Sequence, residues 1–309
     1  MCSFIENIYT TWEEFAKENP VSNLENKRFI YRGQTNSFLN EKFLEWEIVS
    51  SFNRYYSKLH YRFSQFISQQ IAFMDSTYSE YEFVKNSNIL DSNIISKIYF
   101  LQHYGVPTCF IDFTYHPLIA LYFSISSLKG QSGGRNTIDG FPKYYHENYC
   151  FTVIRIDTNK LQTIIGIKDL EHFQLDLFLK YDSYCIDVDR NIYAQIALDL
   201  FPLQSTNNSN NFNLLKQNSC FLLFDNASCN SISFEKFIHL FIEKHHIQIN
   251  EPFITKYHIK YNTAFKPRRS RQPDYTSLFK FLKQNNISGK TLFNDIQGLK
   301  YDFNFFHQE

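Results

Sequence analysis

Residues 101–127 read LQHYGVPTCFIDFTYHPLIALYFSISS, a stretch that predicts a helix end, a short strand and a new helix in close succession. Gly105 permits the positive φ that ends a helix, and Pro107 cannot continue one. The β-branched and apolar run over 108–111 is typical of a buried strand. Elements packed this closely in sequence predict a junction around which the rest of the chain is arranged.

Polar side chains stand on both sides of this expected strand. Asp112 and Thr114 are expected to end it, and Pro117 occupies a favoured first position for the following helix. Either polar side chain is a candidate to accept N–H bonds from that helix, and both are candidates for chemistry. His103 either donates to an anionic group or simply closes the preceding helix.

Outward from this junction the sequence alternates between helical and extended patterns. Helices are expected at 8–17, 94–104, 171–181, 190–200, 233–245, 275–284 and 295–303, with helical spacing dominating 40–84. Strands are expected at 28–34, 149–156, 219–224 and 253–259. The sum predicts an α+β fold: one domain over residues 1–309, with a helical insertion at about 40–100.

Charge and hydropathy exclude several classes of protein. The formal net charge is zero, so no global field favours nucleic acid or membrane surfaces. The run at 266–271 is the exception, and it is either a solvated loop or a contact for RNA or DNA through Lys266, Arg268, Arg269 and Arg271. The longest apolar run, 118–125, is far below the roughly 20 residues that span a bilayer. The N-terminus does not resemble a secretory signal, so we expect a cytoplasmic protein without membrane contact.

Metal and common nucleotide motifs are not expected. The six cysteines form no CxxC pair, which favours reduced and buried thiols. His245 and His246 are adjacent, so their side chains do not face the same way on a helix. The Gly-rich segment 129–136 lacks the Lys-Ser/Thr of a phosphate-binding loop. We therefore expect no metal site.

Arg32 is the first candidate for ligand binding. It ends an apolar strand and precedes Gly33, and its planar guanidinium suits a phosphate or a carboxylate. The alternative is a structural ion pair with Glu47 or Asp112. Gln34 is a candidate to orient a ligand or simply a turn residue.

Several segments resemble the FRG domain family, in the same order along the chain. They are YRGQ at 31–34, the run QHYGVPTCFIDFT with its following Pro, Ala, Leu and Phe over 102–123, and TLFNDIQGL at 291–299. The segment QNSCF at 217–221 resembles the family's later Q-x-G-x-F motif, and Glu47 is similar to an acidic residue of its first helices. The resemblance covers roughly residues 10–305.

The chain also departs from the family pattern. Cys109 stands where the family usually carries Arg, and Ser219 stands where it carries Gly. The Arg expected upstream of Gln217 is missing, with Asn213 nearby.

The motif order of this family is similar to that of ADP-ribosyltransferases with an R-S-E signature. The resemblance implies an ADP-ribosyltransferase-like split mixed β-sheet with NAD as substrate. Arg32 would hold the pyrophosphate or nicotinamide ribose. Thr114, alone or with Asp112, would take the second-strand position, and Gln217 would stand where Glu is expected. The implied catalytic residues are Arg32, Gln217, Thr114 and Asp112, and the implied NAD-binding residues are Tyr31, Arg32, Gly33, Gln34, His103 and Tyr104.

Two classes of function follow as hypotheses. The first is an NAD-dependent ADP-ribosyltransferase, a toxin or antiphage effector that modifies nucleic acid or protein and that an antitoxin protein neutralises. The second is a non-catalytic module of a bacterial defence system that binds a nucleotide or phosphate ligand. An NAD glycohydrolase is a further alternative.

Overall fold

The computed structural model describes residues 3–21, 27–34, 47–56, 63–77, 80–81, 94–126, 137–138, 141–142, 150–166, 168–169, 185–189, 192–199, 216–225, 232–260 and 276–293. The strands are β1 (Ile5–Thr10), β2 (Phe29–Gln34), β3 (Phe110–Thr114), β4 (Thr137–Ile138), β5 (Phe141–Pro142), β6 (Cys150–Asp157), β7 (Lys168–Asp169), β8 (Cys185–Asp189), β9 (Ile192–Asp199), β10 (Ser219–Asp225) and β11 (Ile254–Lys260). The helices are α1 (Trp12–Glu18), α2 (Ser51–Tyr56), α3 (Phe63–Thr77), α5 (Ile94–His103), α6 (Pro117–Ser126), α7 (Thr158–Ile165), α11 (Phe234–Lys244), α12 (Thr276–Gln284) and α13 (Gly289–Leu292).

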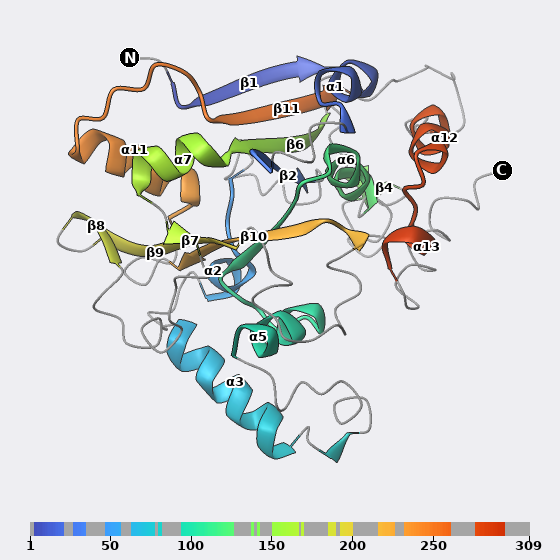
Figure 1. Ribbon diagram of the computed structural model, residues 1–309. Coiled ribbons are helices and arrows are strands. Elements are labelled where there is room, and N and C mark those ends of the chain that lie inside the picture. Colours follow the sequence, from blue (N-terminus) through green and yellow to red (C-terminus); the bar gives the residue numbers. More distant parts are fainter. Residues whose placement is uncertain are drawn as a thin grey trace.

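A mixed sheet of nine strands crosses the centre of the molecule (Figure 1). Its order is β1-β11-β6-β2-β3-β10-β9-β7, and β8 pairs with β9 beside this path. The β1–β11 and β7–β9 pairs are parallel, and the other pairs of the sheet are antiparallel. β4 and β5 form a separate two-stranded sheet. The α+β class is therefore confirmed.

The sheet is weakly joined between β2 and β3. β2 pairs with β6 along its whole length, from Phe29 to Gln34. In the described part of the chain, β2 pairs with β3 only through Tyr31 and Thr114. The remaining described residues of β2 and β3 form no ladder pair with each other.

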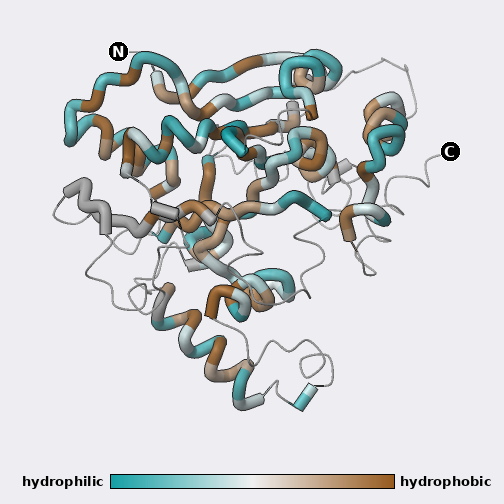
Figure 2. The backbone as a smooth tube through the Cα atoms, in the orientation of Figure 1, coloured by the Kyte–Doolittle hydropathy of each residue, from teal (hydrophilic) through white to brown (hydrophobic). Residues whose placement is uncertain are grey.

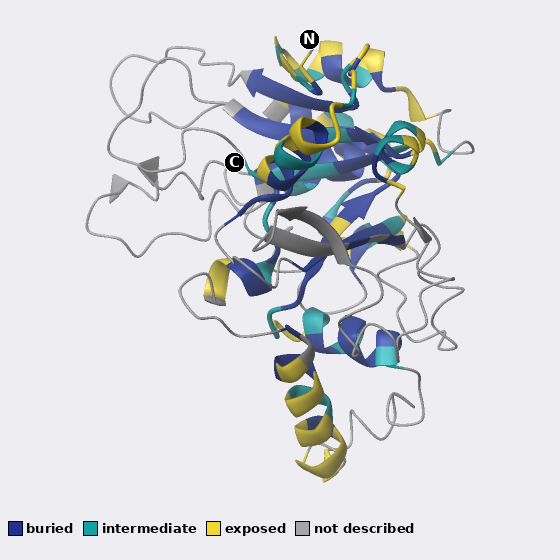
Figure 3. Cartoon of the chain, turned by 90° about the vertical axis from the view of Figure 1, so that its left-hand side faces the viewer, coloured by how far each residue is buried: buried dark blue, intermediate teal, exposed yellow. Residues whose placement is uncertain are grey.

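Helices cover both faces of the sheet, because its buried strands alternate between two apolar faces. Ile30 and Leu222 pack on one face, with α7 and α11. Tyr31 packs on the opposite face, with α1, α6, α12 and α13. Phe221 also packs on that opposite face, with α2, α3 and α5. Figure 3 shows the buried residues gathered in the central strands, whereas much of α3 is exposed.

The helical insertion is present. α2, α3 and α5 lie between β2 and β3 in the chain, and their apolar residues form a core cluster of their own with β3 and β10. α3 shows alternating hydrophobic and hydrophilic bands along its length (Figure 2), as an amphipathic surface helix does. α2 and α3 fall within the segment 40–84, where helical spacing dominates.

The expected helix at 8–17 is wrong at its start. Ile8 to Thr10 belong to β1, whose backbone pairs in parallel with β11. α1 begins only after Thr11, whose hydroxyl accepts from Glu14 N at 3.3 Å while the Glu14 carboxylate accepts from Thr11 N at 3.1 Å. The backbone N–H and C=O groups of residues 8–10 are hydrogen-bonded to β11, and the capping box at Thr11 begins the helix only after them.

The expected helix at 190–200 is also wrong, because β9 occupies this segment. Ile196 and Leu198 are both buried in the first core cluster, and their spacing of two is that of a strand. β9 lies between β10 and β8, and these neighbours fix it as a strand.

β3 is displaced from the expected strand at 108–111. It runs from Phe110 to Thr114, so Asp112 and Thr114 lie within the strand and do not follow it. Thr108 is held outside the strand by Ser51, whose Oγ accepts from Thr108 N at 2.9 Å. Thr114 is kept in the strand by pairing with Tyr31 and Ser219 on its two sides.

Most other elements agree with the sequence to within a residue or two. The confirmed helices are those at 94–104, 233–245 and 275–284, and the confirmed strands are those at 28–34, 149–156, 219–224 and 253–259. The expected helices at 171–181 and 295–303, the Gly-rich segment and the basic run at 266–271 lie outside the described residues. Within the described ranges, no helix combines the length and the apolar character needed to cross a bilayer.

Candidate functional site

Gly33 allows β2 to lie directly against α6. A Cβ atom at this position would lie 2.0 Å from the Ala120 carbonyl oxygen and 2.4 Å from the Ser124 nitrogen. Both are backbone atoms of a buried helix, so no side-chain rotation relieves the clash. The Arg-Gly sequence therefore fixes β2 against α6 and holds Arg32 at a defined depth.

The guanidinium of Arg32 is only partly hydrogen-bonded. Its Nη1 donates to the Asp112 carbonyl oxygen at 2.6 Å, whereas its Nε is buried without a hydrogen-bond partner among the described residues. Burial is the main cause that lowers the pKa of Arg32 to about 10; Asp112 opposes this shift, and Arg54 adds a smaller contribution in the same direction as burial. Arg32 remains charged at neutral pH, and in the described part of the chain its guanidinium forms no ion pair with Glu47 or with the Asp112 carboxylate.

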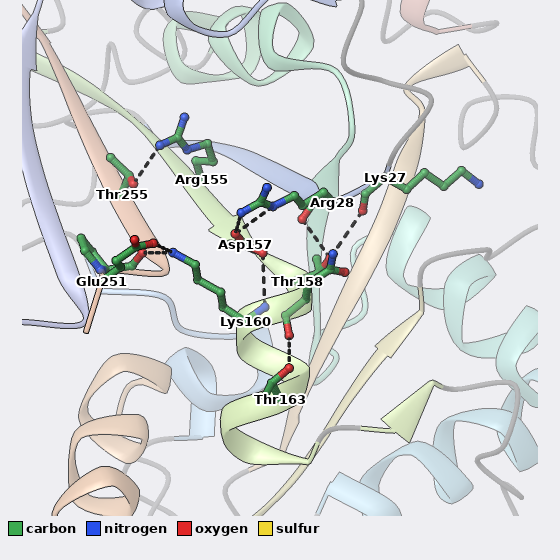
Figure 4. A network of polar contacts seen from close by, with 11 residues as sticks. Lys27, Arg28, Arg155, Asp157, Thr158, Lys160, Thr163, Glu251 and Thr255 are labelled. Atoms are coloured by element: carbon green, nitrogen blue, oxygen red, sulfur yellow. Dashed lines mark hydrogen bonds and ion pairs between the residues drawn. The ribbon is translucent and has the colours of Figure 1, made fainter. Parts of the chain in front are cut away.

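Arg28, just before the same strand, is a useful contrast. Its Nε and Nη2 donate to one oxygen of Asp157 at 3.0 and 2.7 Å, and Thr158 Oγ1 donates to its carbonyl oxygen (Figure 4). Asp157 also caps α7, accepting from Lys160 N at 3.2 Å. Arg28 thus belongs to a satisfied structural network, whereas Arg32 retains a buried donor.

Asp112 supplies a carboxylate beside Arg32. Its Oδ1 accepts from Gln102 Nε2 at 2.6 Å, and Gln102 Oε1 in turn accepts from Thr108 Oγ1. The residue is exposed, yet surrounding protein raises the pKa of its carboxyl because desolvation outweighs the opposing charge of Arg32. Arg32 is bonded to the backbone carbonyl oxygen of Asp112, and the Asp112 carboxylate interacts with it through its charge.

Arg54 is a site residue that sequence reasoning missed. α2 is anchored to Thr108, two residues before β3. Phe52 N donates to the Thr108 carbonyl oxygen at 3.0 Å, and Ser51 Oγ donates to the same oxygen at 3.1 Å. Arg54 follows in α2 and interacts electrostatically with Arg32 and Asp112. Arg54 is partly accessible to solvent, and desolvation by the surrounding protein lowers the pKa of its guanidinium. No motif marks Arg54, since it lies in the helical insertion. Gln102 and Thr108, by contrast, were visible within the central motif.

Gln34 lies on the same side of β2 as Arg32. Its Nε2 is 3.5 Å from the Glu47 carbonyl oxygen, and its Oε1 is buried without a partner among the described residues. Gln34 therefore offers an acceptor beside the unpaired donor of Arg32.

Thr114 and Gln217 serve structural contacts. Thr114 Oγ1 donates to the Gln217 carbonyl oxygen at 2.6 Å and accepts from His116 N at 3.0 Å. Thr114 Oγ1 thus accepts a backbone N–H, but the donor is His116, which precedes α6, and not a residue of the helix as expected. Gln217 Nε2 donates to the Leu292 carbonyl oxygen at 3.2 Å, which ties it to the end of α13. The structure brings both residues next to each other at the ends of β3 and β10.

The remaining implied NAD-binding residues divide into two groups. Tyr31 is buried on the α6 side, its hydroxyl donates to Asn19 Oδ1 at 3.2 Å, and burial raises its pKa to about 12. His103 ends α5 and contacts the Tyr104 ring edge-on, with centroids 5.2 Å apart. Tyr104 is 59% exposed. Tyr31 is thus a core residue, whereas His103 and Tyr104 lie at the solvent end of α5.

Cys109, which replaces the usual family Arg, does not contribute to the Arg32 site. Its side chain is fully buried in the cluster that joins α2, α3 and α5 to β3. Burial raises the pKa of the thiol, and the neighbouring Asp225 carboxylate raises it further. Position 109 therefore points into the core, and the missing arginine leaves the Arg32 site intact.

One family model matches part of the chain. The family model described as FRG domain matches residues 27–132, which run from the start of β2 past the end of α6. The matched segment is similar to an FRG domain and includes Arg32, Arg54, Gln102 and Asp112. Gln217 and the segment 291–299 lie beyond this match. Comparison with curated proteins and with solved structures gives no match.

Proposed function

We propose that this protein is an NAD-dependent ADP-ribosyltransferase whose site is built around Arg32. The observation that carries the proposal is the buried Arg32 Nε, a charged donor without a partner among the described residues. A buried guanidinium edge of this kind is costly unless an anion completes it. The pyrophosphate of NAD is an anion of suitable geometry.

The strand arrangement supports the same proposal. An R-S-E signature requires Arg, a hydroxyl residue and a third polar residue from three strands, and β2, β3 and β10 are consecutive neighbours in the sheet. Thr114 on β3 leads into α6, which carries Ala120 and Phe123. The single pair between β2 and β3 agrees with a split sheet of the ADP-ribosyltransferase type.

The proposed reaction breaks the bond between the nicotinamide nitrogen and C1′ of the ribose. Nicotinamide leaves with the bonding electron pair, and a nucleophile of the acceptor forms the new bond to C1′ while losing its proton. The sugar becomes positively charged along this path, so a nearby negative group stabilises the transition state. Gln217 carries no charge, and Asp112 is the carboxylate that supplies it.

The hydrogen bonds of Gln217 and Thr114 favour a second candidate function, that of a non-catalytic sensor. Both residues are used in hydrogen bonds to backbone atoms, Gln217 to Leu292 and Thr114 to Gln217. Such a module would bind a nucleotide or phosphate ligand at Arg32 without cleaving it. An NAD glycohydrolase differs from the transferase only in using water as the acceptor.

The test is incubation of the protein with NAD labelled in the ADP-ribose, together with cell extract or purified RNA, DNA or protein. Transferase activity gives label on a macromolecule, and hydrolase activity gives nicotinamide release alone. Arg32→Ala should abolish either signal, and Arg28→Ala, which removes an arginine of the satisfied network, should retain it. NAD binding without cleavage would select the sensor, and no binding at millimolar NAD would rule out all three.

A role as a toxin or antiphage effector belongs to the same proposal. Expression of an active transferase should arrest growth, and the arrest should disappear with Arg32→Ala while the protein stays soluble. A nucleic acid target engaged through Lys266, Arg268, Arg269 and Arg271 should lose its label when these four residues are replaced by Gln. An antitoxin partner should restore growth when expressed from the neighbouring gene.

A further inference from the structure

The side chain of Gln102 bridges the end of α5 and the middle of β3. Its Nε2 donates to Asp112 Oδ1 at 2.6 Å, and its Oε1 accepts from Thr108 Oγ1. The backbone of Gln102 is held at the same point, because Gly105 N donates to its carbonyl oxygen at 3.0 Å where α5 ends. Thr108, Gln102 and Asp112 are therefore joined in one line of hydrogen bonds.

Thr108 is the fixed end of this line. The residue is buried, and its Oγ1 accepts from Phe110 N at 3.3 Å. Its backbone is held by α2, since Ser51 Oγ accepts from Thr108 N at 2.9 Å and Phe52 N donates to the Thr108 carbonyl oxygen at 3.0 Å. Because an N–H already points at Oγ1, the hydroxyl is available to donate to Gln102 Oε1. Thr108 thus fixes the Gln102 amide from the core side.

This arrangement favours one orientation of the Gln102 amide while Asp112 is ionised. A carboxylate oxygen only accepts hydrogen bonds, so the NH2 of the amide, and not its oxygen, has to face Asp112 Oδ1. The opposite orientation would bring two acceptors into contact. The hydrogen bond from Gln102 therefore favours the charged form of the carboxyl. Desolvation raises the pKa of Asp112, and the positive charges of Arg32 on β2 and Arg54 on α2 oppose this shift, as Gln102 does.

We propose that Gln102 is a positioning residue, which together with Thr108 holds the Asp112 carboxylate charged and in one orientation beside Arg32. Gln102 occupies Oδ1, and no other described residue donates to Oδ2. Asp112 is exposed, so a substrate has access to its carboxylate. The inference rests on the proposed function, in which Asp112 supplies the negative charge that faces the ribose, and it deepens that function by naming the residues that orient this charge.

The first test is an NMR titration of the aspartate carboxyl carbons in the full-length chain, with the Asp112 signal assigned by its loss in Asp112→Asn. Gln102→Met removes the donor, so the titration midpoint of Asp112 should rise. Thr108→Val removes the hydroxyl that fixes the amide and should also raise the midpoint, whereas Thr108→Ser keeps the hydroxyl and should restore it. Gln162→Met is the matched control. Gln162 is likewise a half-buried glutamine of a helix, α7, and its side chain makes no hydrogen bond within the described ranges, so the midpoint should stay unchanged.

NAD cleavage supplies the second readout. Gln102→Met should lower kcat by about tenfold or more and move the acidic limb of the pH–rate profile to higher pH, because the carboxylate is protonated more easily and is no longer held in place. KM for NAD should change by less than about twofold, since the contacts of Arg32 remain. Thr108→Val should act in the same direction, and Thr108→Ser should recover most of that loss.

The same Asp112 midpoint in Gln102→Met and in wild type would overturn the inference, and so would a wild-type kcat in a Gln102→Met variant whose midpoint has moved. If Gln102→Met fails to fold, Gln102→Glu keeps the shape and places a second carboxylate against Oδ1, which must raise the midpoint. A midpoint that depends on Gln102 in a protein that does not cleave NAD would keep the positioning of Asp112 and reject the transferase. NAD cleavage with a midpoint independent of Gln102 would do the reverse.

Discussion

At the scale of single residues, Arg32 and Gly33 have separate tasks although they are neighbours. Gly33 permits backbone contact with α6, and Arg32 places a guanidinium in the opening beside β3. Gly33 fixes the position of β2 against α6, and the neighbouring Arg32 carries a buried N–H donor without a partner among the described residues. A strand that binds an anion needs both features. The stability of the fold therefore depends on Gly33, and the proposed ligand binding would depend on Arg32.

Replacing Gly33 by Ala should destabilise the protein by about 3 kcal/mol or more, because the new methyl group overlaps backbone atoms of Ala120 and Ser124. Urea unfolding followed by circular dichroism measures the change. Gly166→Ala is the control: its φ of 67° is strained for Ala but nothing lies within 4 Å, so roughly 1–2 kcal/mol is expected. Equal losses for the two variants would contradict the close contact.

Replacing Arg32 by Met should leave the free energy of unfolding within about 1 kcal/mol of wild type, or raise it, since burial of the charge already opposes folding. NAD and pyrophosphate binding should be lost in the same variant. Chemical denaturation and calorimetry on one preparation test both. A large loss of stability would instead assign Arg32 a structural role.

At the scale of elements, a buried ion pair joins three separate segments. Lys256 Nζ on β11 lies 3.0 Å from Glu235 Oε1 on α11, and both side chains are buried. Glu235 Oε2 also accepts from Ile48 N at 2.8 Å, just before α2. Burial raises the pKa of Glu235, and Lys256 opposes that shift. This pair holds the segment that leads into α2, and so it supports the position of Arg54.

Glu235→Ala should cost about 3–5 kcal/mol, because it leaves Lys256 buried without its carboxylate and Ile48 N without an acceptor. The exposed neighbour Lys236 is the control, and Lys236→Ala should change stability by less than about 0.5 kcal/mol. Guanidinium unfolding measures both variants. Similar values for the two would show that the buried pair contributes little.

At the scale of the whole molecule, pH should act through a buried histidine on β11 that joins the edge strand β1 to β6. His258 accepts or donates through Nδ1 to Thr152 Oγ1 at 3.1 Å and through Nε2 to Asn7 Oδ1 at 3.0 Å. Burial lowers its pKa to about 4. The unfolded chain therefore takes up this proton near pH 6.5, whereas the folded protein does so only near pH 4.

The stability of the protein should fall as pH decreases from 6.5 to 4, by an amount on the order of 3 kcal/mol from His258. Unfolding free energies measured at pH 7 and pH 4.5 give the slope. The variant His258→Gln should show a smaller difference between the two pH values than wild type, whatever its absolute stability. An unchanged difference would remove His258 as a source of the acid sensitivity.

Much of the architecture could be predicted from the sequence, since local patterns decided it. Gly105 ends α5 with a φ of 87°, Pro117 begins α6, and Ser233 caps α11 by accepting from Lys236 N. These signals act within a few residues, so they operate before the chain is folded. Arg32 was identified for the same reason, as an arginine at the end of an apolar strand before a glycine.

Only the tertiary structure decided the rest. β1 and β9 are strands because partners distant in sequence pair with them, and Arg54 belongs to the site because α2 is anchored at Thr108. Gln217 and Thr114 turned out to be bonded to backbone atoms, which no spacing in the sequence reveals. Local propensity and motif order depend on neighbours in the chain, whereas pairing, burial and the meeting of charges depend on neighbours in space.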